Sequence, residues 1–106
     1  MTEPTRTVTP IFDPVTGPLV PVTAAGRDWV IVVEHAAAVD RWCPHQDADM
    51  ARGSVAGRAL KCPLHGFLFD TRSGRGMNCR FSTETRPAAL VDGRWHVDGV
   101  PAEIAS

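Results

Sequence analysis

Two short clusters of cysteine and histidine constrain this chain more than any other feature of its sequence. The first reads Cys43-Pro44-His45, and the second, after residues 46–61, reads Cys62-Pro63-Leu64-His65. Each cluster is short enough to form the tip of one loop, and each offers one thiolate and one imidazole. Two such loops brought together would supply four metal ligands, two of sulfur and two of nitrogen. We therefore expect a fold that holds two loop tips side by side.

Three other roles for these residues compete with that reading. Structural zinc also accepts two cysteines and two histidines, but its usual spacing puts both cysteines in one half and both histidines in the other. A disulfide between Cys43 and Cys62 is disfavoured in a reducing compartment. A catalytic cysteine–histidine pair would leave the second pair unexplained. The mixed clusters favour a metal centre to which both loops supply one cysteine and one histidine. A zinc-stabilised interaction module stays open as an alternative.

The order and spacing of the four residues resemble the pattern of the Rieske iron–sulfur family, Cys-x-His followed by Cys-x-x-His. The resemblance continues through residues 62–70, CPLHGFLFD, which are similar to the second ligand loop of that family. It implies one Rieske-type [2Fe–2S] cluster, with Cys43 and Cys62 on one iron and His45 and His65 on the other. It implies no catalytic residue in the chain.

The length of the sequence and the spacing of its turn residues predict a small β protein. A chain of 106 residues has room for one domain, so we expect residues 1–106 to form a single unit. Many short apolar runs separated by turn residues predict an all-β fold, a small antiparallel sandwich or barrel. The Rieske resemblance implies the same architecture, with a cluster-binding subdomain of about residues 41–80 inserted between strands.

One run, Trp29–Val33, is the strongest strand candidate, because it is continuous, apolar and β-branched. Its continuity predicts a strand that is covered on both faces. Residues 36–39 are expected to pair back with it, and the tail after Gly99 is expected to fray. The other predicted strands are the proline-containing edge strands 7–12 and 19–23, the strands 58–61 and 67–69 around the second cluster, and a hairpin of 88–91 with 95–97 turning at Asp92-Gly93.

The charge of the chain is unevenly distributed. Its formal net charge is −1, which gives no general reason to expect binding to nucleic acid or to an anionic membrane. Residues 41–80 carry seven basic side chains against three acidic ones, whereas the rest of the chain carries four against nine. Two readings remain open: solvated surface arginines, or a basic cluster-bearing end that meets an acidic patch on a redox partner.

The neighbours of the four ligands indicate a low reduction potential. High-potential Rieske proteins carry hydroxyl donors where this chain has Phe67 and Phe69, and a loop-joining disulfide where it has Ala48 and Leu64. These differences predict a potential near the lower end of the Rieske range, on the order of −150 mV. Among the remaining residues of interest, Cys79 is expected to be a small buried apolar side chain, with a place in the loop that shields the cluster as the alternative. Trp42 is expected to pack beneath the cluster, with a place at a docking surface as the alternative. His35 and His96 are expected to be ordinary surface or strand histidines.

The resemblance also implies a function. We expect a freestanding Rieske-type ferredoxin that accepts one electron from a flavin-dependent reductase and passes it to a terminal oxygenase, without being an enzyme itself. The alternative is a small subunit of an assimilatory nitrite reductase or a similar complex. No apolar run approaches the ~20 residues that span a bilayer, and no secretory signal is visible, so the expected compartment is the cytoplasm.

Overall fold

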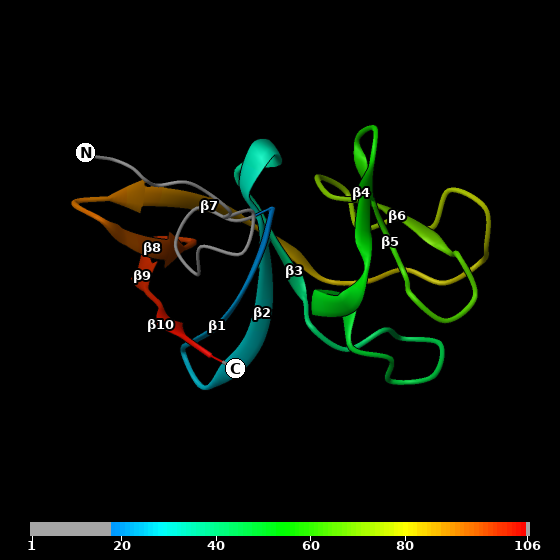
Figure 1. Cartoon of the computed structure of the whole chain (residues 1–106), viewed down its shortest axis with the longest axis horizontal. Helices are drawn as coiled ribbons and strands as arrows, with labels where there is room; N and C mark the ends of the chain where they lie inside the picture. Colours follow the sequence, from blue (N-terminus) through cyan, green and yellow to red (C-terminus); the bar gives the residue numbers. More distant parts are fainter. Residues whose placement is uncertain (1–17, 106) are drawn as a thin grey trace, which may run out of the picture.

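The computed structural model describes residues 18–105 and consists of two antiparallel sheets (Figure 1). The larger sheet has the strand order β10-β1-β2-β3-β7-β8-β9, and the smaller one has the order β4-β5-β6. The described residues contain no α-helix, only the short 3₁₀ helices η2 (Val33–His35) and η3 (Met50–Arg52). The predicted all-β class is therefore confirmed. The strands are β1 (Leu19–Ala24), β2 (Arg27–Val32), β3 (Ala37–Asp40), β4 (Ser54–Ala56), β5 (Ala59–Lys61), β6 (Leu68–Asp70), β7 (Thr85–Val91), β8 (Arg94–Val97), β9 (Val100–Pro101) and β10 (Glu103–Ile104).

The smaller sheet is an insertion in the larger one. The chain leaves the larger sheet after β3, forms β4 to β6, and returns with β7, which pairs with β3. The two sheets occupy opposite ends of an elongated molecule (Figure 1). The expected subdomain inserted between strands is confirmed, whereas its limits at about residues 41 and 80 and the extent of the domain over 1–106 stay predictions.

Strand β2 is buried on both faces, as its continuous apolar run predicts. Trp29 and Ile31 lie in the core inside the larger sheet, and Val30 and Val32 lie in a second core under the smaller sheet. All four are at most 3% exposed, so this single strand stabilises both halves of the molecule through the burial of apolar surface. The second core also contains Val39, Cys43, Met50, Leu60, Cys62 and Phe69.

Strand β1 is not the edge strand that Pro21 suggested. It pairs with β2 on one side and with β10 on the other. The pairing with β10 covers only Val22 and Thr23, and the Pro21 carbonyl accepts a further bond from the N–H of Ala105. The proline therefore lies where this short pairing ends, and its missing N–H interrupts no ladder.

The C-terminal tail is ordered, so the expectation that it frays is wrong. Ala102 is buried and donates its N–H to the Trp95 carbonyl, and Arg94 contacts Glu103 at 3.0 Å. Because β9 and β10 are the two edges of the larger sheet and only Ala102 separates them, the sheet is nearly closed. The β7–β8 hairpin is confirmed, with Asp92 and Gly93 both at positive φ. The expected strand 7–12 lies outside the described residues.

Candidate metal centre

The two Cys/His clusters form two loops with the same backbone hydrogen bonds. In the first loop the N–H of Cys43 donates to the Ala48 carbonyl at 2.9 Å, and the Cys43 carbonyl accepts from Asp47 at 2.8 Å. In the second loop the N–H of Cys62 donates to the Phe67 carbonyl at 2.8 Å, and the Cys62 carbonyl accepts from Gly66 at 3.2 Å.

In both loops the residue four positions after the cysteine has positive φ, 56° at Asp47 and 70° at Gly66. Aspartate and glycine tolerate this left-handed conformation better than other residues do. The loops are therefore local equivalents of each other, and they differ in the position of the histidine.

The loops come from different sheets. The first follows β3 of the larger sheet and is closed by a bridge between Trp42 and Asp49. The second connects β5 to β6 in the smaller sheet. A centre made from both loops thus spans the two sheets, which the sequence alone did not reveal.

The four predicted ligands lie together as two pairs. Cys43 and Cys62 are 0% and 1% exposed, and their thiols interact directly with each other. The Nδ1 atoms of His45 and His65 are 3.3 Å apart, and their rings meet edge to face at a centroid distance of 4.6 Å. The thiols lie inside the protein, whereas His45 is half-buried and His65 is exposed. Within residues 18–105, no group of three or more His, Cys, Asp or Glu side chains is arranged to hold a single metal ion.

This donor set fits a group that takes two thiolates at one metal and two imidazoles at another. Two nitrogen ligands about 2.0–2.1 Å from one tetrahedral metal lie roughly 3.3 Å apart, which is the separation of the two Nδ1 atoms. Burial raises the pKa of the Cys43 thiol, and the neighbouring Cys62 thiol acts in the same direction. The backbone N–H groups of His45 and Gln46 lower that pKa, so donors that stabilise a sulfur anion are already in place.

Aromatic rings surround the imidazole pair. The Phe67 ring packs against His45 at 4.8 Å and against His65 at 5.8 Å, and the Phe81 ring packs against His45 at 5.3 Å. Neither phenylalanine can donate a hydrogen bond, and Phe69 is fully buried in the second core, to which both cysteines also belong. The surroundings are therefore apolar, as the sequence indicates.

An ion pair fastens the base of the first loop. Asp49 accepts from Nε and Nη2 of Arg41 at 2.9 and 3.0 Å, and from the backbone N–H of Ala51 at 3.0 Å. The hydrogen bond from Arg41 is the main reason that the pKa of Asp49 lies below its ordinary value. Sequence reasoning missed this pair, because residues 8 positions apart in a loop have no periodic signal.

The surroundings of three other singled-out residues, Trp42, Cys79 and His35, can now be compared with what the sequence predicts. Trp42 does not pack beneath the centre: it is 41% exposed and donates its indole N–H to Asp28. Cys79 is a free thiol, partly buried against the second core. His35 is bonded to the smaller sheet, which makes the expectation of an ordinary surface or strand histidine wrong.

Comparison with known proteins gives consistent matches. The family model of the Rieske [2Fe-2S] domain matches residues 10–89. The ferredoxin component of the naphthalene 1,2-dioxygenase system of Pseudomonas aeruginosa is 32% identical over 73% of this chain and 76% of that protein. The solved ferredoxin of carbazole 1,9a-dioxygenase from Nocardioides aromaticivorans is similar in fold, with a TM-score of 0.62 and 21% identity over 84% of this chain and 85% of that one.

Some relatives are much longer than this chain. A cholesterol 7-desaturase of Hemicentrotus pulcherrimus is 32% identical over 80% of this chain, which corresponds to 19% of the desaturase. The chain therefore spans about a fifth of that relative. In the part of the chain that the structure describes, no helix is long and apolar enough to cross a membrane.

Proposed function

The chain belongs to the Rieske [2Fe–2S] domain family, and from this membership we propose that it is a one-electron carrier between a flavin-dependent reductase and a terminal oxygenase. The family implies a Rieske-type [2Fe–2S] cluster as the cofactor. Such a cluster supplies reversible uptake and release of single electrons. The role of the protein is then to hold the cluster rigidly and to bring one side of it to the surface.

The arrangement of the four side chains is the observation that carries this proposal. Cys43 and Cys62 would hold the buried iron, and His45 and His65 would hold the outer one. The N–H groups of His45 and Gln46 would stabilise the Cys43 thiolate. The exposed His65 would form the shortest path between the cluster and a docked protein, because it is the ligand with the largest contact with solvent.

The ferredoxin components among the relatives support a carrier role. The match covers 76% of the naphthalene 1,2-dioxygenase ferredoxin component and 19% of the desaturase. The proposal assigns the chain electron transfer without catalysis of its own.

We also propose the cytoplasm as its compartment. Cys43 and Cys62 are free thiols lying against each other, and they must stay reduced to bind iron. An oxidising compartment would favour their linkage as a disulfide.

The experiment is a redox and metal analysis of the purified protein, followed by reconstitution with the reductases and oxygenases of its own organism. We expect two irons and two acid-labile sulfides per chain, uptake of one electron, and NADH-driven oxygenase turnover that depends on the protein. His45→Ala and His65→Ala should abolish the absorption and the redox activity, whereas His96→Ala, a matched histidine on β8, should keep both. A colourless preparation containing zinc would exclude the cluster, and a redox-active protein that supports no oxygenase would exclude the carrier role.

A further inference from the structure

The centre depends on how the two sheets are placed relative to each other. Cys43 and His45 follow the larger sheet, and Cys62 and His65 belong to the smaller one. Apolar contacts in the second core hold the sheets together near the ligands. Apolar packing is non-directional, so it does not by itself fix the angle at which the smaller sheet lies. A directional contact at another point of the smaller sheet would fix it.

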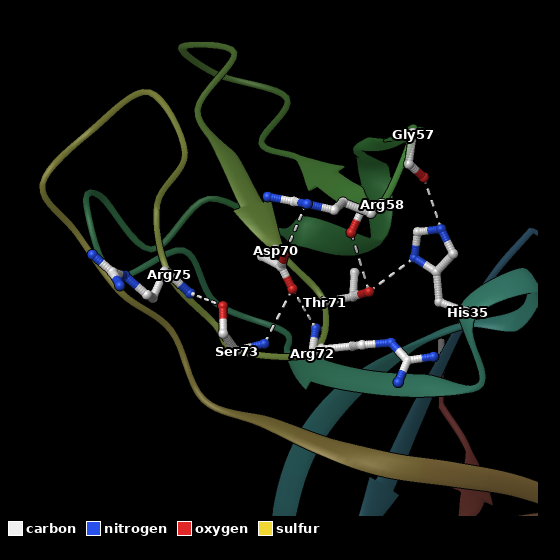
Figure 2. Close-up of polar contacts among 8 residues, drawn as sticks. All are labelled: His35, Gly57, Arg58, Asp70, Thr71, Arg72, Ser73 and Arg75. Atoms are coloured by element: carbon white, nitrogen blue, oxygen red, sulfur yellow. Dashed lines mark hydrogen bonds and ion pairs between the residues drawn. The ribbon is translucent and has the colours of Figure 1, made fainter.

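Such a contact comes from His35, at the end of η2 between β2 and β3. Its Nε2 lies 2.8 Å from the Gly57 carbonyl oxygen, and its Nδ1 lies 2.9 Å from Oγ1 of Thr71 (Figure 2). Gly57 lies in the turn between β4 and β5, and Thr71 directly follows β6. One imidazole of the larger sheet thus bonds two separate segments of the smaller sheet.

The partners determine which ring nitrogen carries the proton. The Gly57 carbonyl can only accept, so Nε2 must donate to it. In the neutral ring Nδ1 is then an acceptor. The single hydrogen of the Thr71 hydroxyl has two acceptors in reach, Nδ1 at 2.9 Å and the Arg58 carbonyl at 3.3 Å, and we assign it to the shorter contact. Thr71 is 3% exposed, and among the described residues it is the one polar side chain that is buried. Loss of its bond to His35 would leave this buried hydroxyl with only the longer contact to the Arg58 carbonyl at 3.3 Å.

The segment that His35 holds is itself rigid. The N–H of Thr71 donates to the Arg58 carbonyl at 3.2 Å, and Nε of Arg58 contacts Asp70 at 2.9 Å. Asp70 also accepts from the N–H groups of Arg72 and Ser73 at 2.8 and 3.1 Å (Figure 2). These two N–H groups are the main reason that the pKa of Asp70 is lowered. A displacement of Thr71 would therefore move β5 and β6 with it.

The contacts of His35 lie at one end of the smaller sheet, and the second ligand loop lies at the other. Strands β5 and β6 run antiparallel, with Ala59 opposite Asp70 at the His35 end and Lys61 opposite Leu68 at the ligand end. The three paired residues make a stiff arm of about 10 Å. We propose that His35 is a positioning residue that fixes this arm, and through it the place of Cys62 and His65 opposite Cys43 and His45. The proposal rests on the proposed cluster, and it adds a residue outside the ligand motif to the site.

The test measures cluster retention in the holoprotein, as the loss of visible absorption in excess chelator well below the melting temperature. Thr71→Val removes the hydroxyl with little change of shape, and we expect it to speed cluster loss roughly fivefold, as one lost hydrogen bond allows. Thr71→Ser should restore the wild-type rate. His35→Ala should act at least as strongly, and in the double variant the two effects should not add. Electron paramagnetic resonance of the reduced variants should show a broader spread of g-values.

Two controls separate positioning from general stability. His96→Ala removes a histidine whose Nδ1 contacts only the nearby Arg94 carbonyl among the bonds the structure shows, so it should leave retention unchanged. Val97→Ala weakens the core of the larger sheet, so it should lower the melting temperature without speeding cluster loss at low temperature.

Equal cluster loss in Val97→Ala and Thr71→Val, or unchanged retention and g-values in both Thr71→Val and His35→Ala, would overturn the positioning role. Because no redox partner enters these measurements, failure of the carrier proposal would not be mistaken for failure of this one. Should His35→Ala not fold, the Thr71 pair still decides the outcome.

Discussion

At the scale of single residues, the most informative position is Phe69. It is fully buried in the same apolar core as Cys43 and Cys62, at the sequence position that matches a tyrosine of high-potential Rieske proteins. We expect Phe69→Tyr to raise the reduction potential, because a hydroxyl that donates to a cysteine sulfur stabilises the more negative, reduced cluster. A bond stronger by about 1 kcal/mol in the reduced state corresponds to roughly 40 mV. Redox titration of both proteins measures the shift, and we expect the wild-type potential on the order of −150 mV.

The matched control for that substitution is Phe81→Tyr. Its ring contacts His45 and Phe67, so the same hydroxyl is placed at the imidazole side of the site. The control should change the potential less than Phe69→Tyr does. Equal shifts in the two variants would show that general polarity, and not a bond to sulfur, sets the potential.

Asp49 gives a prediction for the dependence of stability on pH. Its pKa is lowered mainly by Arg41, so its contribution is present above the ordinary carboxyl pKa and is lost as the pH falls through the lowered one. At about neutral pH, Asp49→Ala should reduce the free energy of unfolding by about 2 kcal/mol, through loss of the Arg41 bonds and of the cap on Ala51. Urea unfolding should show this difference shrinking in acid.

Glu103→Gln is the control for Asp49. It breaks a second arginine–carboxylate pair, but one in which the Arg94 and Glu103 side chains are 52% and 75% exposed. Exposed pairs contribute little, so this variant should unfold almost as the wild type does at every pH. A pH-independent effect of Asp49→Ala would assign its role to packing.

At the scale of elements, the β4–β5 hairpin must bring Gly53 against the backbone of β5, the strand that leads into the second ligand loop. Gly53 has an ordinary φ of −79°, but a Cβ there would overlap the carbonyl oxygen of Lys61, the residue before Cys62. We expect Gly53→Ala to cost about 1–3 kcal/mol by overpacking and to lower the iron content, because the strand that leads into the loop must shift.

Gly93→Ala is the matched glycine substitution. A Cβ at Gly93 meets no atom within 4 Å, although its φ of 79° makes alanine strained. It should cost about 1 kcal/mol and leave the iron content at the wild-type level. Iron analysis and urea unfolding of both variants test these expectations. Equal iron content in the two variants would contradict the inference that close packing at Gly53 positions the second ligand loop.

The elements also show what the sequence could and could not predict. The two Cys/His clusters, the central strand over residues 29–32 and the turn at Asp92-Gly93 follow from spacing and local residue preference, which act within a few positions. Strand β10 could not be predicted, because two residues carry no periodic pattern and its partner β1 lies at the other end of the described chain. The role of His35 was hidden for the same reason, since Gly57 and Thr71 are 22 and 36 positions away.

At the scale of the whole molecule, charge and shape divide the protein into two ends. The smaller sheet and both ligand loops lie at one end, and the tip of the β7–β8 hairpin lies at the other (Figure 1). The basic excess of residues 41–80 therefore lies at the end where the two Cys/His loops lie. Lys61 and Arg80 are exposed there, next to Cys62 and Phe81 in sequence. Basic side chains on one protein attract acidic side chains on its partner over separations up to about the Debye length, and this attraction speeds association.

If the chain has the proposed carrier role, this polarity predicts how it associates with an oxygenase. Replacing both Lys61 and Arg80 by glutamine should slow association about tenfold at low salt, and the difference should vanish near 1 M salt, where the Debye length is about 3 Å. The control is a pair of exposed residues at the opposite end, Leu90→Glu with Val91→Glu, which changes the net charge equally. Stopped-flow reduction of the oxygenase measures both. If the two pairs of substitutions slow association equally, the net charge and not the basic end guides docking. If neither pair slows it, Lys61 and Arg80 are only solvated surface residues.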